Sequence, residues 1–411
     1  MIGSAVQLGS VRTAGLLLGM VMNVLLARLL GPSGFGELAF LLSLVTLLAA
    51  ISSGGLSSLL TREVASSPGC PIPLGSSLRW VLLSTSSFAT VVFGVVSMGW
   101  TTFSFPTTDI FLALVGLGIV AITSGILRGA GRPVAADLPI SVLIPAGFSL
   151  IVVAMSSRGT LEFTQAFAGY TTAVWIAAVI AIAVLLIRGE FVRRGVASGP
   201  ISRNWLASFA PFSFLALIAA LNGQLGTVMV GIFAAEADTA FFRVADRVAA
   251  LVSMPLVVLN AVIAADIARG YASGDVGAVL DLVRRARRWA ILGATPLILG
   301  MVIFGRELVQ FLFGSQYAAG SYLTLVILVA GQAVNVVCGS VGLALTMCAR
   351  EKFVLREQAV AMGMAAIALP PVILFAGITG AAAVVSVVLA AWNLRLLAIL
   401  NREFATTPAA S

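Results

Sequence analysis

The chain contains no histidine, a single lysine and only three cysteines among its 411 residues, and these shortages exclude several functions. Without histidine it lacks the commonest general base and metal ligand. Cys70, Cys338 and Cys348 are odd in number and match no metal-ligand spacing, so we expect neither a disulfide framework nor a metal site. The P-loop, H-E-x-x-H and G-x-S-x-G patterns are also missing from the sequence. We therefore expect no enzyme activity, no ATP-driven engine and no cofactor.

Charged residues are scarce as well. They make up 10% of the chain, against about 25% in soluble domains. Hydrophobic residues make up 60%, and the mean hydropathy is +1.10. The net charge of +8 does not indicate a nucleic-acid partner, because the arginines lie at the ends of apolar runs, where orientation signals of membrane proteins belong.

What the chain does contain is a repeated apolar run of about 20 residues, the length that crosses a bilayer core of roughly 30 Å as a helix. The first run continues past Arg28 into the second, so we expect no cleaved signal peptide. The sequence therefore predicts an all-α polytopic membrane protein with 12 transmembrane helices. The predicted spans are 10–30, 36–60, 78–100, 109–128, 134–156, 164–187, 208–234, 240–266, 289–305, 321–348, 357–376 and 379–400.

Arginine is concentrated in alternate breaks between these spans, and the positive-inside rule then predicts cytoplasmic N- and C-termini. One of the two longest breaks, 188–207, joins the sixth and seventh spans. We expect an N-terminal six-helix lobe at 1–190, a cytoplasmic linker at 191–207, a C-terminal six-helix lobe at 208–403 and a short tail at 404–411. In a second long break, 267–288, an apolar stretch precedes four arginines, which predicts a short amphipathic helix at an anionic inner surface.

The two predicted lobes show the same pattern of breaks. A shift of 203 residues places 27–40 on 230–243, and both windows contain the end of an apolar span, a tight turn on the outer side and the start of the next span. An even number of spans in each half predicts parallel repeats, related by a pseudo-two-fold axis along the membrane normal.

Ionisable side chains at membrane depth usually face a bundle interior or a watery cavity. Arg243 and Arg247 share a helix face, and Arg243 can also reach Asp246. Two guanidinium groups in a cavity would bind a diphosphate; alternatively, the cluster extends toward the outer interface. Asp246 is a candidate for ion coupling, although its arginine neighbours would hold it ionised.

Other polar residues in the spans are candidates for lining a substrate cavity, with interhelical hydrogen bonds as the alternative. Asn23 and Arg28 are five residues apart and do not share a face, and Arg28 could also extend to the interface. The motifs Gly15-x-x-x-Gly19 and Gly125-x-x-x-Gly129 predict close helix packing. The remaining candidates are the pairs Asn222 and Gln224, and Gln332 and Asn335.

Several stretches give the chain a family resemblance. They are Ala27-Arg-Leu-Leu-Gly-Pro-Ser-Gly-Phe-Gly-Glu-Leu-Ala-Phe40, Thr61-Arg-Glu-Val-Ala65, Ala264-Ala-Asp-Ile-Ala-Arg-Gly-Tyr-Ala-Ser-Gly-Asp275, Phe313-Gly-Ser-Gln-Tyr-Ala-Ala319 and Gly331-Gln-Ala-Val-Asn335. In these stretches the chain resembles the polysaccharide-transporter (O-antigen flippase) family. It departs from that pattern at Thr346-Met-Cys-Ala349, where the family often has an Asn-Met-Thr-Gly-like run.

The resemblance implies two six-helix lobes around a central cavity, similar to multidrug extruders and lipid II flippases. It also implies a function, flipping an undecaprenyl-diphosphate-linked oligosaccharide to the outer leaflet of the inner membrane by alternating access. Arg28, Arg243 and Arg247 then lie near positions where the family has polar, cavity-facing residues. Membrane lipids surround such a protein, and glycosyltransferases or a polymerase of the same pathway are candidate partners.

Two alternatives remain open. A multidrug exporter would favour an acidic cavity that attracts cations, whereas this chain offers basic residues. An integral-membrane glycosyltransferase or polymerase generally needs a large extramembrane loop or paired carboxylates, and the breaks between these spans are short.

Overall fold

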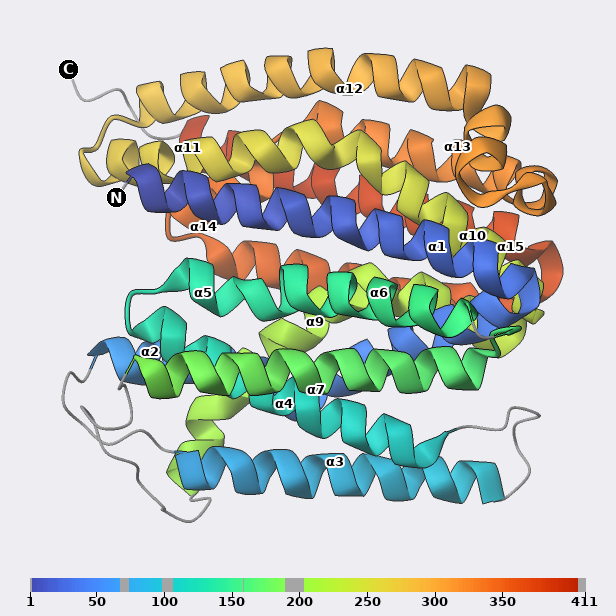
Figure 1. The fold of residues 1–411 in the computed structure, drawn as a ribbon. Coiled ribbons are helices and arrows are strands. Elements are labelled where there is room, and N and C mark those ends of the chain that lie inside the picture. Colours follow the sequence, from blue (N-terminus) through green and yellow to red (C-terminus); the bar gives the residue numbers. More distant parts are fainter. Residues whose placement is uncertain (1, 67–73, 98–105, 158, 189–202, 406–411) are drawn as a thin grey trace. The chain divides into compact units, whose positions relative to one another are not determined.

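The computed structural model describes residues 2–66, 74–97, 106–157, 159–188 and 203–405 (Figure 1). Regular structure in these ranges is entirely helical, which confirms the predicted all-α class. Cys70, residues 191–202 of the predicted linker and the end of the predicted tail lie outside the described residues. The longer helices are α1 (Ile2–Ala49), α2 (Gly55–Ser66), α3 (Leu74–Ser97), α4 (Thr107–Gly129), α6 (Ile144–Ser156), α7 (Phe163–Ile187), α9 (Arg203–Phe233), α10 (Glu236–Ala250), α11 (Met254–Ala272), α12 (Val276–Phe313), α13 (Ser315–Cys338) and α15 (Glu351–Ala405).

Short elements continue several of these helices. The chain turns through a π-helix, η1 (Ala50–Gly54), before α2 and through a 3-10 turn, η3 (Leu251–Ser253), before α11. Helix α5 (Pro133–Leu138) and the π-helix η2 (Pro139–Leu143) lead into α6, and α14 (Val341–Met347) follows α13. Irregular turns of this kind inside membrane helices are tolerated where neighbouring groups satisfy the backbone.

Nine helical stretches in the described part of the chain are long and apolar enough to cross a membrane. Two of them, Gly9–Ser66 and Glu351–Phe404, have 58 and 54 residues, more than twice the length that one span needs. Each contains a glycine with non-helical backbone angles, Gly31 (φ 69°) in α1 and Gly377 (φ 60°) in α15. These glycines lie where the sequence predicts breaks, at 31–35 and 377–378, and the chain is a multi-pass membrane protein.

The structure differs from the sequence prediction at two further places. The predicted span 321–348 is interrupted at Gly339, which has a φ of 76° and separates α13 from α14. The amphipathic segment before residue 289 is helical, as predicted, but it is the first part of α12 and continues directly into the span. Asp275 starts this helix because its carboxylate accepts a hydrogen bond from the Ala278 amide at 2.9 Å.

The first of two compact units contains residues 1–30 and 41–224. Its core lies between α2, α3, α4, α7 and the start of α9, where Leu59, Leu60 and Ile126 are fully buried. The rings of Trp80, Trp205 and Phe209 pack together beside them, with centroids 5.1–5.9 Å apart.

Close helix packing was predicted for two glycine motifs, and one is confirmed in full. A Cβ at Gly125 or Gly129 would lie 2.7–3.0 Å from atoms of α2, so α4 and α2 approach through both glycines. Gly15 likewise approaches Ser141, whereas a Cβ at Gly19 would have nothing within 4 Å.

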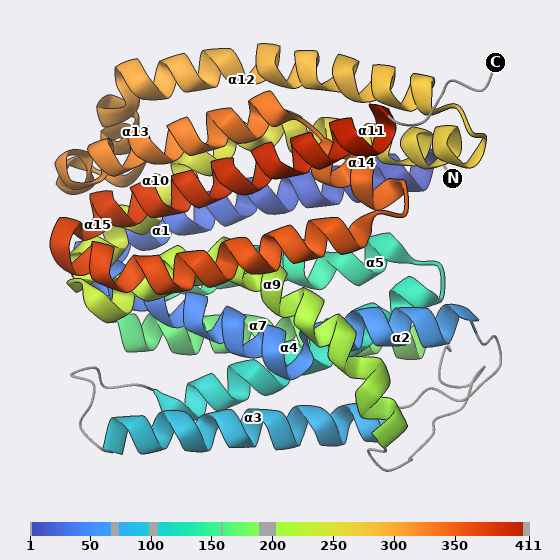
Figure 2. The ribbon, with the colours of Figure 1, turned by 180° about the vertical axis from the view of Figure 1, so that it is seen from behind.

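The second unit contains residues 31–40 and 225–411, so its boundary falls inside α9 and it also takes a segment of α1. Within it, α11 and α12 run side by side, and α13 packs against α12, α10 and α15 (Figures 1 and 2). Tyr317 of α13 is fully buried, and its ring lies 6.1–6.4 Å from the rings of Phe35, Phe241 and Phe313.

Candidate functional site

The segment Gly31–Phe40 packs against the end of α9 and the start of α10 within the second unit. A Cβ at Gly36 would lie 1.8 Å from the carbonyl oxygen of Glu236, and a Cβ at Gly231 would lie 2.4 Å from the ring of Phe40. Glycine is required at Gly36 because no side chain fits against the Glu236 backbone, and at Gly231 because a Cβ would overlap the Phe40 side chain. These are the windows that the shift of 203 residues aligns, so the two aligned windows contact each other.

This contact also brings together carboxyl groups that sequence analysis did not select. The Ser33 hydroxyl donates a hydrogen bond to the Glu236 carboxylate, and the carboxyl group of Glu37 lies against the same carboxylate. Neither glutamate forms an ion pair with a cation of the described residues. Two like charges held this close repel each other unless a proton or a cation lies between them. Residue spacing along a helix cannot reveal such a pair, because its two members come from distant parts of the chain.

The predicted charge cluster lies on α10. Arg243 is buried, with 6% of its surface exposed, and its charge interacts with those of Arg247 and Asp246. Arg247 Nε lies 3.9 Å from Asp246 Oδ2, and both of these side chains are about 30% exposed. The structure therefore brings the three predicted residues together, as their spacing indicated. A buried guanidinium in a membrane-spanning helix is costly, which makes a functional role for Arg243 the first hypothesis to test.

Gln332 and Asn335 form a second polar pair in the same unit. They lie on one face of α13, where Asn335 Nδ2 donates a hydrogen bond of 3.2 Å to Gln332 Oε1. Both side chains are half-buried, and α13 packs against α10. The predicted shared face is confirmed, and each amide keeps further donors or acceptors for another partner.

The other candidate residues belong to the first unit. Asn23 is buried, and its Nδ2 donates a hydrogen bond of 2.6 Å to the Gly19 carbonyl, so this amide group serves its own helix. Arg28 is exposed, which agrees with the prediction that it does not share a face with Asn23. Asn222 is exposed and Gln224 is half-buried on α9.

The cysteines provide a test of burial. Cys348 lies between α14 and α15 and is fully buried, and this burial raises the pKa of its thiol. Maleimides react with the thiolate, whose fraction at neutral pH falls as the pKa rises. We therefore expect a Cys70→Ser/Cys338→Ser variant to be labelled slowly at pH 7 and fully after denaturation. Rapid labelling of the native variant would show that Cys348 is accessible.

The sequence matches a known protein family. The family model described as "Polysaccharide biosynthesis protein" matches residues 4–265. No curated protein matches the sequence at the stringency applied.

Solved structures with the same fold cover nearly the whole chain. An inward-facing multidrug resistance MATE family transporter of the MOP superfamily aligns with a TM-score of 0.66 at 16% identity, over 97% of this chain and 99% of the other. The lipid II flippase MurJ in an inward closed conformation aligns with a TM-score of 0.70 at 12% identity, over 98% and 88% of the two chains. A MOP superfamily transporter from Pyrococcus furiosus aligns with a TM-score of 0.61 at 15% identity, over 98% and 96%. These likenesses establish a MATE- and MurJ-like fold.

Proposed function

Because the chain belongs to the polysaccharide biosynthesis protein family, we propose that it is a flippase for an undecaprenyl-diphosphate-linked oligosaccharide. It would move the headgroup from the cytoplasmic to the outer leaflet of the inner membrane, as a carrier and not as an enzyme. With α3 counted as a span and α1 and α15 each divided at their glycine, the proposed topology has twelve spans in two six-helix lobes around a central cavity, with both termini cytoplasmic.

The substrate sets the physical requirement for such a carrier. A diphosphate with attached sugars cannot cross hydrocarbon unaided, because each unsatisfied polar group there costs several kcal/mol. Its carrier must therefore present cations for the phosphates and amides for the hydroxyl groups, while the polyprenyl tail stays in the bilayer.

The observation that supports this proposal most directly is the buried guanidinium of Arg243 beside Asp246 and Arg247 on α10. Guanidinium groups bind phosphate oxygens bidentately, and they are more favourable in a dry site than a lysine ammonium. We propose that Arg243 and Arg247 bind the diphosphate. Gln332, Asn335, Asn23, Asn222, Gln224 and Arg28 are proposed as further headgroup contacts, and Asp246 as the residue that couples transport to an ion.

The proposal predicts that charge reversal in the cluster stops export. We expect Arg247→Glu, and Arg243→Glu, to reduce surface polysaccharide at least about tenfold, since a lost charge-assisted bond is worth about 1.5–3 kcal/mol. The measurement is the amount of surface glycan in cells that depend on this chain, together with transfer of a fluorescent undecaprenyl diphosphate glycan across proteoliposomes.

Two controls separate transport from folding. Arg306→Glu makes the same change in charge at an exposed position of α12 and should leave export unchanged. Arg243→Lys keeps the charge but removes the planar fork, so it should bind the diphosphate more weakly while remaining in the membrane. Full export by a well-expressed Arg247→Glu variant would exclude the proposed diphosphate contact.

A further inference from the structure

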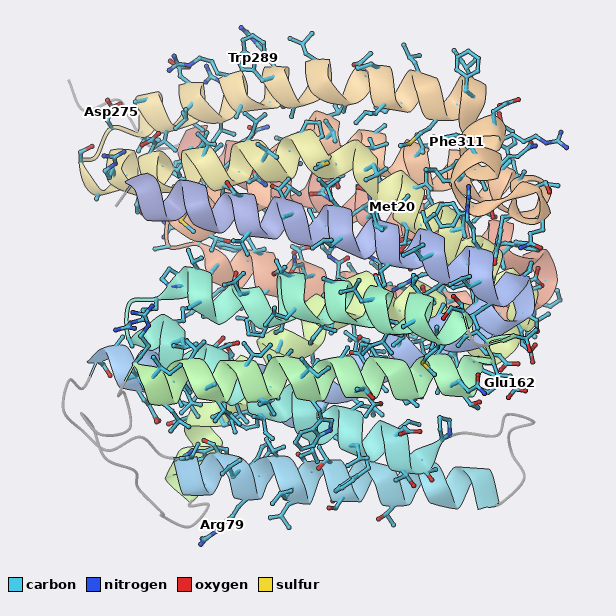
Figure 3. The ribbon with its side chains drawn as sticks, viewed as in Figure 1. Met20, Arg79, Glu162, Asp275, Trp289 and Phe311 are labelled. Carbon is cyan, nitrogen blue, oxygen red and sulfur yellow. The ribbon has the colours of Figure 1, made fainter. Side chains whose placement is uncertain are left out.

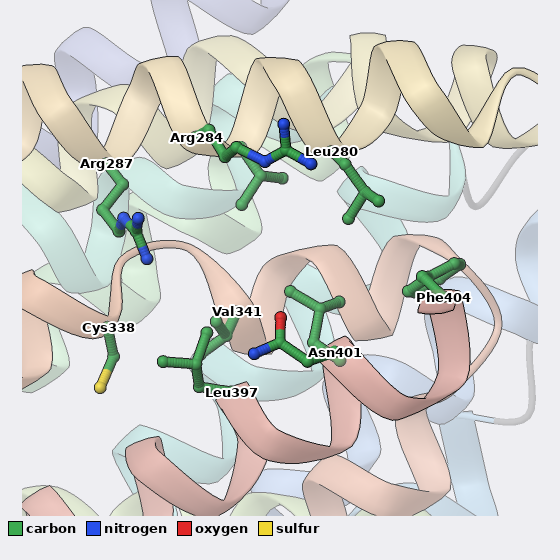
Figure 4. A pocket seen from close by; sticks show the side chains of 10 residues that line it. Leu280, Arg284, Arg287, Cys338, Val341, Leu397, Asn401 and Phe404 are labelled. Atoms are coloured by element: carbon green, nitrogen blue, oxygen red, sulfur yellow. The ribbon is translucent and has the colours of Figure 1, made fainter. Parts of the chain in front are cut away.

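The second unit contains a pocket of about 560 Å³, and no residue of the α10 cluster lines it. It lies between the first part of α12, the turn around Gly339 and the last turns of α15 (Figure 4). Arg284 and Arg287 reach into it from α12, and Asn401 reaches into it from α15. Leucine, valine and phenylalanine side chains and Cys338 form the rest of its wall. The pocket therefore combines a cationic rim with an apolar floor.

The backbone holds one of these arginines in place. Gly339 lies directly beneath the stem of Arg287, and a Cβ there would lie 2.9 Å from Arg287 Cβ and Cγ. This glycine also has a φ of 76°, a conformation that other residues rarely adopt. The close approach limits the directions that the Arg287 guanidinium can take, and in Figure 4 it points into the space between α12 and α15.

One of the two arginines that line the pocket can bind an anion without breaking an ion pair of the described residues. Arg284 pairs with Asp281 at 2.9 Å, but no acidic side chain of the described residues forms an ion pair with Arg287. Arg285 and Arg288 add two more positive charges on the same two turns of α12. An anion in the pocket would thus meet two guanidinium groups and an amide, a donor set suited to a phosphate.

The sequence of α12 indicates where this site lies relative to the membrane surface. Trp289 follows Arg287 and is 66% exposed, and Leu292, Leu299 and Phe311 continue an exposed apolar face along the helix. In Figure 3, Trp289 points away from the other helices of the unit. Exposed tryptophan marks the membrane interface. At 1.5 Å per residue, Arg287 and Arg284 lie about 3 Å and about 7.5 Å beyond Trp289, at the level of lipid headgroups.

We propose that this pocket binds an anionic phospholipid, with the phosphate on Arg284, Arg287 and Asn401 and the start of an acyl chain against Leu397 and Phe404. Charge complementarity selects an anionic lipid, because basic pockets between membrane helices favour anionic headgroups over zwitterionic ones. The apolar floor selects a lipid over a free phosphate. This site needs only the membrane, so it is independent of the proposed transport activity.

Native mass spectrometry of the full chain tests the proposal by titration with phosphatidylglycerol. We expect a first phosphatidylglycerol to bind more tightly than phosphatidylcholine, and Arg284→Gln/Arg287→Gln to weaken it at least about tenfold. The matched control is Arg288→Gln, which removes a charge one residue from Arg287 but does not line the pocket, and it should leave the affinity unchanged. Leu397→Trp, which fills the floor without changing charge, should also weaken binding.

Three results would overturn the proposal. Equal weakening by Arg288→Gln would show attraction to the whole basic turn and no defined site. Displacement of phosphatidylglycerol by inorganic phosphate would identify a site for a free anion. Binding of undecaprenyl diphosphate in preference to phosphatidylglycerol, with the same loss in the double variant, would make the pocket a substrate site instead.

Discussion

Gly36→Ala should strongly destabilise the folded state of this chain, although it adds a single methyl group. A Cβ at this position would lie 1.8 Å from the carbonyl oxygen of Glu236 and 2.6 Å from its carbonyl carbon. Both are backbone atoms at the first turn of α10, so no rotamer change relieves the clash. The helices must separate instead, which exposes the packing around Phe35 and Phe40, both buried. We expect a loss above about 3 kcal/mol, a large part of the 5–15 kcal/mol that stabilises a typical protein.

Fluorescence-detected size-exclusion chromatography after detergent extraction measures this effect. The variant should give little monodisperse protein and a strongly lowered unfolding temperature. Gly363→Ala is the matched control, because a Cβ at Gly363 in α15 has nothing within 4 Å and alanine favours a helix. A Gly36→Ala protein that unfolds at the wild-type temperature would contradict the close approach of these backbones.

The contact at Gly36 also shows what could and what could not be predicted from the sequence. The break at Gly31-Pro32 was predictable, because proline and glycine interrupt helices locally. The similarity of 27–40 and 230–243 was predictable from their pattern. Their mutual contact was not, since periodicity describes the faces of a helix and does not name the partner of each face. For the same reason the Glu37–Glu236 pair escaped detection, although each glutamate is visible in the sequence.

For the candidate site, too, the sequence predicted the groupings within one helix but not the contacts between distant segments. Arg243, Asp246 and Arg247 belong to one helix, so their spacing of three and four residues was enough to group them. Gln332 and Asn335 followed from the same rule. Asn23 is equally polar, but its side-chain amide donates a hydrogen bond to the carbonyl four residues earlier in the same helix. Residue spacing alone does not distinguish this local hydrogen bond from a side chain that faces a cavity. The pocket at Arg287 needed the turn at Gly339 and the end of α15, which only the tertiary structure places together.

Arg128→Gln should destabilise the first unit by about 1.5–3 kcal/mol, the value of a charge-assisted hydrogen bond lost from a buried carboxylate. Asp137 of α5 is buried, with 8% of its side chain exposed, and Arg128 of α4 pairs with it at 2.5 Å. Arg128 Nη1 also donates a hydrogen bond of 3.2 Å to Ser57 of α2. One guanidinium thus ties together the ends of three helices, next to the position where Gly125 and Gly129 let α4 approach α2.

The paired variant Arg128→Met/Asp137→Leu separates the cost of keeping a buried carboxylate without Arg128 from the net value of the ion pair. Replacing both charges with apolar groups of similar size removes the desolvation penalty, so this double variant should unfold at a temperature close to wild type and well above Arg128→Gln. Thermal unfolding in detergent, followed by tryptophan fluorescence from the Trp80–Trp205 cluster of the same unit, measures the difference. A double variant as unstable as Arg128→Gln would contradict this account. It would show that the bond to Ser57, which both variants lose, holds these helix ends together and that the Asp137 carboxylate does not depend on Arg128.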